Sequence, residues 1–415
     1  MELKKYKLGD IAKIEISGVD KKSVDGETPV RLCNFVDVYR NWAITQKLSE
    51  NFMIASAKET EIAKCSIHKG QVAITKDSET RDDIGIPAYI ADDFDNVLLG
   101  YHCALITPND DVLDGKYLNA FMHTRYIQKY FENNASGSGQ RYTLSNETIF
   151  QIPILLPSLE VQKAIGNLLS NIDRKIELNR QINDNLEQQT QALFKSWFVD
   201  NPKPNWSETT FSEVANFIGG YSYKGEELTD SSNIAMVTIK NFGRNGGFKA
   251  DGFKGIAPFV KLKECHYANL FDILVAHTDL TQNADVIGNA ELLLTYGRYD
   301  GIIFSMDLVK VLPKNNFPYR FLLAAMLKNK IFKGHCLGYV NGTTVLHLSK
   351  KALPNFEVKI PPKAEAKTMN DALAPYYQRM AEVLQENDRL IHLRDTLLPK
   401  LMSGELNINA KSRLQ

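Results

Sequence analysis

The sequence predicts an α+β protein: two tandem α+β globules separated by two long antiparallel helices that form an intramolecular coiled coil. Two observations predict this fold class, an internal repeat with a shift of 204 residues and a heptad-patterned segment at the end of each copy. A chain of 415 residues is also too long for one ordinary hydrophobic core and suits two or three domains. The period is too long for a solenoid, so the repeat indicates a tandem pair of domains.

Short matching segments carry the repeat. Four pairs of segments share the shift of 204 residues: 116–120 with 320–324, 144–145 with 348–349, 152–157 with 356–361, and 193–194 with 397–398. The openings match after small insertions, since Leu8–Ala12 resembles Phe211–Ala215. A constant shift over so long a stretch favours duplication over the alternative, two unrelated domains with common apolar patterning.

The repeat also predicts the domain boundaries. The expected parts are a first globule at 1–157, a first spacer helix and linker at 158–204, a second globule at 205–360, a second spacer helix at 361–405 and a tail at 406–415. Short β-like runs are predicted at 71–75, 88–91, 104–107, 272–276 and 308–312. One short helix is predicted in each globule, at Tyr117–Phe131 and at Tyr319–Phe332.

Each copy ends in a segment with the pattern of a long packed helix. The first, Leu159–Phe198, contains no proline and one glycine, and its seven-residue stripe is Ile165, Ile172, Asn179, Leu186 and Leu193. The second, Ala364–Met402, places Met369, Tyr376, Val383, Leu390 and Leu397 at the same positions. Pro375 is expected to kink or restart this second helix. Asn179 and Asn387-Asp388 place polar groups at or near the seam, where such groups fix the register of a coiled coil.

The two helices can pack together as an antiparallel pair with one globule at each end, which buries both stripes within one chain. Two alternatives are that each helix folds onto its own globule and that the helices mediate dimerisation. A helix of this length spans ~60 Å, more than the diameter of one globule, which argues against the first alternative. The second alternative stays open.

The sequence contains no motif for intrinsic catalysis. It has no P-loop, no HExxH and no nearby set of metal ligands, so we expect no cofactor and no metal. Asn201–Pro204 lacks the aromatic residue of an amino-methyltransferase motif and is interpreted as a linker, and Glu365–Lys367 as the start of the second helix. His102 and His335 each neighbour a cysteine without metal-ligand spacing, and we interpret them as ordinary buried or solvated residues.

Cysteine usage and hydropathy bear on the compartment. The five cysteines lie far apart and form no CxxC pair, which is typical of a reducing cytoplasm. No apolar run approaches the ~18 residues that a membrane helix needs, and the N-terminus lacks an apolar signal region. The sequence therefore predicts a cytoplasmic protein that does not bind a membrane.

Two pairs of matching loops have the most unusual composition. Residues 135–143 correspond to 338–345, and residues 75–81 correspond to 277–283. Small residues allow close backbone approach, and Arg, Gln and Asn side chains can contact the base edges of DNA. Ordinary polar surface loops are the alternative. The candidate DNA-binding residues, with two basic additions at Lys240 and Arg244, are Lys76, Thr80, Arg81, Ser138, Gln140, Arg141, Tyr142, Thr278, Gln282, Asn283, Tyr339, Asn341, Thr343 and Thr344.

Net charge gives no support to nucleic-acid binding by itself, since 49 basic residues balance 49 acidic ones. Residues 1–157 hold 18 basic and 22 acidic residues, and residues 205–360 hold 17 and 14. The mildly acidic first globule is unfavourable for binding phosphates alone. A partner that supplies most phosphate contacts would remove this difficulty.

Three segments point to a known family. They are Leu193–Phe198 at the end of the first helix, Leu397–Leu406 at the end of the second, and Leu156–Gln162 before the first helix. With the repeated order of globule, proline segment and long helix, they resemble the specificity subunit of type I restriction-modification systems. The second copy departs from the pattern at Pro361–Ala366, which lacks the counterpart of Gln162.

The resemblance implies two target-recognition domains, each reading one half of a split, asymmetric site in double-stranded DNA. It implies that the helices act as a spacer and dock two methyltransferase subunits, which bind S-adenosylmethionine and methylate adenine. It further implies restriction subunits that add ATP-driven translocation and cleavage. The chain itself is then a non-catalytic specificity subunit. A coiled-coil scaffold without DNA recognition and an enzyme with an unrecognised site are the alternatives.

Overall fold

The computed structural model describes residues 2–137, 139–244 and 246–408. The chain divides into two compact units: unit 1, Met1–Ile176 with Leu390–Gln415, and unit 2, Glu177–Arg389. The long helices α8 (Leu159–Phe194) and α12 (Lys363–Ser403) therefore contribute a stretch to each unit. Within the described residues, no helix has the length and apolarity needed to cross a bilayer.

Unit 1 contains four sheets. The main sheet has the order β2-β10-β6-β8-β4, with β2 (Ala12–Ile16), β10 (Cys103–Pro108), β6 (Val72–Thr75), β8 (Pro87–Ile90) and β4 (Ala43–Ile44). The others are β5-β3-β9, with β5 (Met53–Ala57), β3 (Thr28–Cys33) and β9 (Val97–Leu99); β11-β12-β7, with β11 (Ser136–Gly137), β12 (Tyr142–Thr143) and β7 (Asp77–Ser78); and the pair β1 (Lys4–Lys7) with β13 (Pro153–Leu156). The shorter helices of unit 1 are α1 (Leu8–Ile11), α2 (Phe35–Arg40), α3 (Gln46–Ser49), α4 (Glu59–Cys65), α5 (Gly115–Met122), α6 (Arg125–Asn134) and α7 (Asn146–Phe150).

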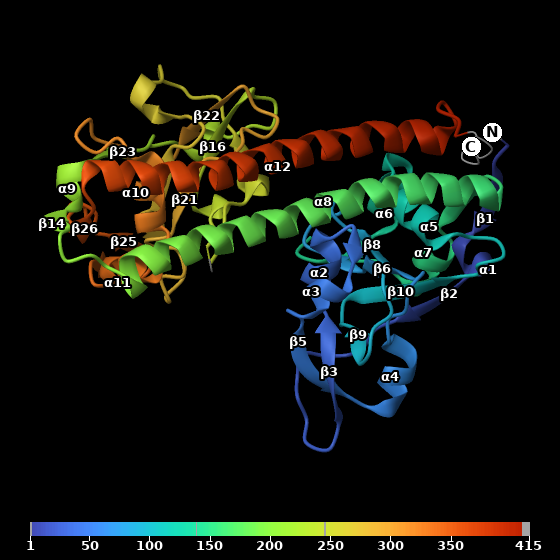
Figure 1. Cartoon of the computed structure of the whole chain (residues 1–415). Coiled ribbons are helices and arrows are strands. Elements are labelled where there is room, and N and C mark those ends of the chain that lie inside the picture. Colours follow the sequence, from blue (N-terminus) through green and yellow to red (C-terminus); the bar gives the residue numbers. More distant parts are fainter. Residues whose placement is uncertain (1, 138, 245, 409–415) are drawn as a thin grey trace, which may run out of the picture. The chain divides into compact units, whose positions relative to one another are not determined.

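Helix α5 packs between the main sheet and the first stretch of α8 (Figure 1). Tyr117 of α5 is fully buried and shares a hydrophobic core with Ile165 and Leu169 of α8. The single glycine of α8, Gly166, allows this approach, because an added Cβ atom would lie 2.8 Å from the backbone nitrogen of Tyr117. The lone glycine of the heptad-patterned segment is thus a packing site.

Unit 2 repeats most of these elements. Its sheets are β14-β26, with β14 (Ser207–Thr210) and β26 (Glu357–Ile360); β15-β23-β19-β21, with β15 (Ala215–Gly219), β23 (Leu308–Pro313), β19 (Ile273–Ala276) and β21 (Ala290–Leu292); β17-β16-β22-β18, with β17 (Lys254–Gly255), β16 (Ile234–Val237), β22 (Gly301–Phe304) and β18 (Tyr267–Ala268); and β20-β25-β24, with β20 (Thr278–Asp279), β25 (Leu346–Leu348) and β24 (Val340–Asn341). Its α-helices besides the long pair are α9 (Phe211–Val214), α10 (Arg320–Leu327) and α11 (Lys330–Leu337).

The strand pairings support the predicted duplication. The pair β1-β13 corresponds to β14-β26, and β2-β10-β6 corresponds to β15-β23-β19. Each unit also has a parallel pair, β3 with β9 in unit 1 and β16 with β22 in unit 2. The α+β fold class is confirmed, and the five predicted β-like runs are strands whose ends are shifted by at most one residue.

Two helix predictions need correction. The segments at 117–131 and 319–332 are each two helices, because Thr124 and Asn329 have extended backbone and act as N-caps of α6 and α11. Helix α12 runs without interruption through Pro375, so the expected restart there is wrong. Apolar side chains of α12 belong to the main hydrophobic core of unit 2. This packing stabilises the helix by more than the loss of the one backbone hydrogen bond that Pro375 removes.

The paired stretches of α8 and α12 run antiparallel in both units. In unit 2, Asn179 donates from Nδ2 to Asn387 Oδ1 at 2.8 Å, and Asn183 donates to the Met380 carbonyl at 3.4 Å. In unit 1, Arg394 lies 3.9 Å from Asp173. Residue numbers thus rise along α8 as they fall along α12. The predicted polar seam at Asn179 and Asn387 is present, and it specifies the register.

A buried charge cluster joins α8 to the rest of unit 2. The Lys328 ammonium lies 2.5 Å from Glu291 Oε2 on β21 and 3.0 Å from Glu187 Oε2 on α8. Burial raises the pKa of Glu291, and the two carboxylates raise the pKa of Lys328 against the effect of its own burial. The ammonium therefore stays charged and pairs with one buried carboxylate, Glu291, and one half-buried carboxylate, Glu187.

We expect Lys328→Met to destabilise unit 2 by about 3–5 kcal/mol, because it leaves the buried Glu291 and the half-buried Glu187 without a cation. Urea unfolding followed by tryptophan fluorescence measures this, with Trp197 and Trp206 in unit 2 and Trp42 in unit 1 as the reporting residues. The exposed Lys330→Met in α11 is the matched control and should change little. Adding Glu187→Gln and Glu291→Gln should recover part of the loss. Unchanged stability of Lys328→Met would contradict this role of the cluster.

Candidate nucleic-acid interface

The structure brings the two unusual loops of unit 1 together. In the small sheet β11-β12-β7, Tyr142 pairs with Ser78 and Thr143 pairs with Asp77. The described residues of 75–81 and 135–143, which were predicted as separate loops, therefore form one continuous surface. We call this surface edge 1; it comprises β7, β11, β12 and the loop residues beside them.

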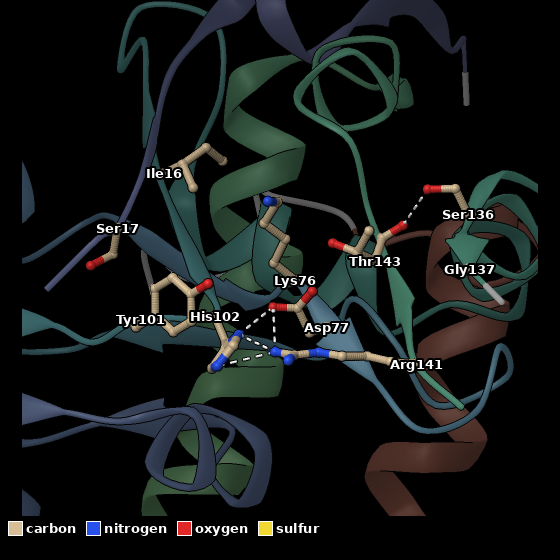
Figure 2. Close-up of a pocket in the computed structure, with 10 residues that line it drawn as sticks. All are labelled: Ile16, Ser17, Lys76, Asp77, Tyr101, His102, Ser136, Gly137, Arg141 and Thr143. Atoms are coloured by element: carbon tan, nitrogen blue, oxygen red, sulfur yellow. Dashed lines mark hydrogen bonds and ion pairs between the residues drawn. The ribbon is translucent and has the colours of Figure 1, made fainter. Parts of the chain in front are cut away.

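Three side chains from separate segments meet at edge 1 (Figure 2). His102 Nδ1 lies 2.5 Å from Asp77 Oδ2, and Arg141 Nη2 lies 3.5 Å from the same oxygen. Arg141 Nη2 also lies 2.6 Å from His102 Nδ1. A neutral imidazole nitrogen cannot both donate to the carboxylate and accept from Arg141. We assign its hydrogen to the bond with Asp77, and Arg141 then pairs with Asp77 through charge.

The electrostatics make Asp77 an anchor for Arg141. Burial pushes the pKa of Asp77 upward, but hydrogen bonds from Thr143 and His102 and the charge of Arg141 hold this pKa below its ordinary value. The Asp77 side chain is 16% exposed and that of Arg141 is 59% exposed. An ionised, mostly buried carboxylate thus orients an exposed guanidinium, whose remaining N–H donors are free to contact a ligand.

The other predicted residues of edge 1 lie around this group. Arg81 is exposed and lies over the Tyr142 ring, with 5.0 Å from its guanidinium carbon to the ring centroid. Thr80 and Gln140 are exposed, whereas Lys76 is half-buried and lines a cleft of about 380 Å³ beside Asp77, His102 and Arg141. Ser138 lies outside the described residues.

Sequence reasoning missed His102, which was interpreted as an ordinary residue. Its backbone has φ of +73°, in the left-handed region that non-glycine residues rarely occupy. Its carbonyl accepts a hydrogen bond from the Lys76 backbone at 2.7 Å, and its ring packs against the exposed Tyr101 at 3.8 Å between centroids. Only the pairing of β6 with β10 brings His102 to Asp77, so no local signal could reveal it.

Unit 2 has an equivalent edge with the same backbone frame. In unit 1, the backbone N–H of Lys76 donates to the His102 carbonyl, and that of Leu144 donates to the Lys76 carbonyl. In unit 2, the backbone N–H of His277 donates to the Asp307 carbonyl, and that of Leu348 donates to the His277 carbonyl. Lys76 is therefore equivalent to His277, and the sequence alignment of these loops was shifted by one residue. We call this surface edge 2; it comprises β20, β24, β25 and the loop residues beside them.

The side chains of edge 2 differ from those of edge 1. The counterparts of Asp77, His102 and Arg141 are Thr278, Asp307 and Val345. The Thr278 hydroxyl donates to Asp307 Oδ1 at 2.9 Å, and Thr278 is buried. Gln282 donates to the Thr343 carbonyl at 2.9 Å, which joins the two predicted loops of this edge. The exposed predicted residues are Gln282, Asn283, Asn341, Thr343 and Thr344, and Tyr339 is half-buried.

The two basic candidates of unit 2 have different neighbours. Arg244 is exposed, with its Nε atom 3.8 Å from Asp285 Oδ2, which places it beside the loop that carries Gln282. Lys240 is exposed and lies near Lys254, whose pKa is lowered by burial and by the charge of Lys240. Within the described residues, no group of three His, Cys, Asp or Glu side chains could hold a metal ion.

Comparisons with known proteins identify the family. The model of the type I restriction modification DNA specificity domain matches residues 1–188 and 203–392. The chain is 24% identical to the type I restriction enzyme HindI specificity subunit of Haemophilus influenzae, over 83% of this chain and 88% of that protein. It is 25% identical to the MjaIX specificity subunit of Methanocaldococcus jannaschii, over 84% and 81%. The fold is similar to that of the S subunit from M. genitalium, with a TM-score of 0.55 and 16% identity over 97% of this chain and 96% of that one.

The anchoring role of Asp77 predicts a pH dependence. Because the folded-state pKa of Asp77 lies below its ordinary value, its contribution to stability is present above the unfolded pKa of ~3.9 and is lost as the pH falls through the folded pKa. The melting-temperature gap between wild type and Asp77→Asn should therefore stay constant above the unfolded pKa of ~3.9 and close as the pH falls below it, through the lower folded-state pKa. Calorimetry across this range checks it, with the exposed Asp82→Asn as control. A gap that widens in acid would contradict it.

Proposed function

The chain belongs to the type I restriction-modification DNA specificity family, and from this premise we propose that edges 1 and 2 each read one half of a bipartite, asymmetric site in double-stranded DNA. The observation that carries the proposal is the pair of equivalent edges. Both use the same backbone hydrogen bonds, yet they present different exposed polar side chains. A duplicated scaffold with different reading surfaces is what recognition of two unlike half-sites requires.

The chemistry of each edge suits base contact. The guanidinium of Arg141 is held by Asp77, and Arg is the side chain that most often pairs with guanine in the major groove. Edge 2 instead exposes the amides of Gln282, Asn283 and Asn341, which suit the adenine edge. We therefore propose that the half-site of unit 1 contains a guanine and that of unit 2 an adenine at the contacted position.

The reaction chemistry then belongs to partner subunits. We propose that the outer surfaces of α8 and α12 dock methyltransferase subunits, two per complex, and that restriction subunits join this assembly in the cytoplasm. Leu178 and Ile182 support docking on α8, because they lie one turn apart and are 45% and 38% exposed. Leu393 is similarly exposed on α12. Apolar side chains in such positions are available to a partner.

Arg141→Ala in the complex with its methyltransferase should relax the half-site read by unit 1 and leave the other half-site unchanged. The expected loss of discrimination is about 1–3 kcal/mol at one base position. Long-read methylation mapping in a host carrying both subunits measures it. Arg141→Lys is the sharper control, because it keeps the charge and loses the bidentate geometry.

Asn341→Ala should relax only the half-site of unit 2, for the same reason. The exposed Asn316→Ala, in the loop before α10, is the matched control. Equal loss on all DNA sequences from either edge variant would indicate a phosphate contact in place of base reading. Unchanged methylation motifs in both edge variants would contradict the proposed reading surfaces.

Lengthening the helix pair should change the spacing of the half-sites alone. Four residues inserted after Asn183 and four after Val383, which lie at matching levels of the antiparallel pair in unit 2, lengthen both helices by ~6 Å. The methylated motif should gain one or two base pairs of spacer, at ~3.4 Å each, with both half-sites unchanged. An altered half-site at unchanged spacing would contradict the spacer role.

A further inference from the structure

A second cleft in unit 1 concentrates positive charge. It measures about 530 Å³ and lies between α2, the start of α6 and the last part of α12. Arg40, Arg125 and Arg394 line it, with Asp395 as the lining carboxylate. Arg394 is paired, 3.0 Å from Asp395 and 3.9 Å from Asp173. Arg40 and Arg125 are exposed, and within the described residues no carboxylate lies in ion-pair contact with either.

The N-terminus of α6 adds backbone donors to this cleft. Its N-cap, Thr124, makes no side-chain cap hydrogen bond to the helix, and its hydroxyl instead donates to the Phe121 carbonyl at 2.7 Å. The first backbone N–H of the helix with an acceptor inside it is that of Ile127, so the N–H groups of Arg125 and Tyr126 keep free donor capacity. The helix dipole places partial positive charge at the same point. Arginines and unfilled backbone donors converge here, which is the chemistry of an anion site.

A three-layer stack fixes one wall of the cleft. The Trp42 ring lies between the His123 ring, at 4.0 Å and 7°, and the Arg394 guanidinium, at 4.7 Å. Burial, and then the charge of Arg394, lowers the pKa of His123 to about 3, so this ring is neutral near pH 7. Trp42 Nε1 and His123 Nε2 are buried without a hydrogen-bond partner. Stacking on Trp42 therefore holds the Arg394 side chain against the other elements of unit 1.

We propose that this cleft, which we call the arginine cleft, binds a backbone phosphate of the DNA whose bases edge 1 reads; this inference rests on the proposed function. Helix α6 connects the two sites, with the cleft at Arg125 and β11 of edge 1 two residues beyond Asn134. Its ten residues span ~15 Å. This helix length is comparable with the ~12 Å width of the major groove, as contact with bases and with a flanking phosphate of one duplex requires.

The charge of unit 1 favours a local site over a general one. Residues 1–157 carry more acidic than basic residues, so a phosphate contact made by this domain itself depends on a local cluster of basic side chains. An anion in the cleft would meet Arg40, Arg125 and the α6 backbone without a competing ion pair. A phosphate group on DNA is the anion that a domain reading bases encounters along its whole length.

The test measures DNA binding by the complex with its methyltransferase subunits as salt is varied. The probes are fluorescent duplexes of about 30 base pairs carrying the methylated motif or a scrambled sequence. Arg40→Ala and Arg125→Ala should each weaken binding roughly tenfold on both duplexes. Each should also reduce the slope of log K against log salt by about 0.9. The methylated motif should not change.

Two variants serve as controls. Lys64→Ala removes the same charge from an exposed position on α4 and should leave affinity and slope as in wild type. Arg125→Lys retains a cation and should restore most of the slope. Thermal melts equal to that of wild type show that the arginine variants fold, as expected for exposed side chains.

Three results would overturn the inference. Wild-type affinity and slope in both arginine variants would show that the cleft holds no phosphate. Weaker binding on the motif duplex alone would indicate a base contact. Loss of the methyltransferase from the purified complex would show that the cleft binds carboxylates of that partner. Failure of the wild-type complex to bind either duplex would instead refute the proposed function itself, so the two failures are distinguishable.

Discussion

The antiparallel contact between α8 and α12 supplies part of the core of both units, and the rest of the structure depends on it. In unit 1, Ile165 and Leu169 of α8 share a core with Leu398 and Leu401 of α12. Unit 1 therefore needs residues that the chain contributes only after all of unit 2. A polar contact such as that of Asn179 with Asn387 adds little stability, but a shifted register would bury its amides unpaired. The register of the helices is thus fixed more by the cost of wrong pairings than by the strength of the right one.

Duplication explains how one chain can carry two equivalent edges with different side chains. The backbone hydrogen bonds around Lys76 and around His277 are the same, so neither edge depends on its side chains for its shape. Side chains at these positions can change without loss of the sheet. In edge 1 the position of Asp77 carries an ionised anchor for a guanidinium, and in edge 2 the equivalent Thr278 makes a neutral bond to Asp307. Backbone hydrogen bonds therefore determine the shape of each edge, and the side chains determine what each edge can contact.

Local patterns predicted much of the fold and little of the site. The 204-residue shift and the seven-residue stripe are periodic patterns, which can be read directly from the sequence. The stripe corresponds to α8 and α12, and the shift corresponds to the repeated elements of the two units. The breaks at Thr124 and Asn329 were missed because apolar residues continue across them and only capping geometry reveals the boundary. His102 beside Asp77, and Lys328 between Glu187 and Glu291, are products of long-range pairing and leave no local signal. Composition identified the loops of both edges but could not show that they form one surface.

The neutral charge of the chain is consistent with a division of labour in DNA binding. Phosphate contacts raise affinity for every sequence, whereas base contacts raise affinity for one. A subunit with a strongly basic surface would bind non-specific DNA tightly. It would thereby reduce the ratio of specific to non-specific affinity, which defines specificity. A balance of 49 basic and 49 acidic residues avoids this, and the exposed guanidinium of Arg141 is held by the Asp77 carboxylate, which offsets its long-range charge. Under the proposed function, discrimination comes from geometry at the two edges, while partner subunits supply most of the attraction to the phosphate backbone.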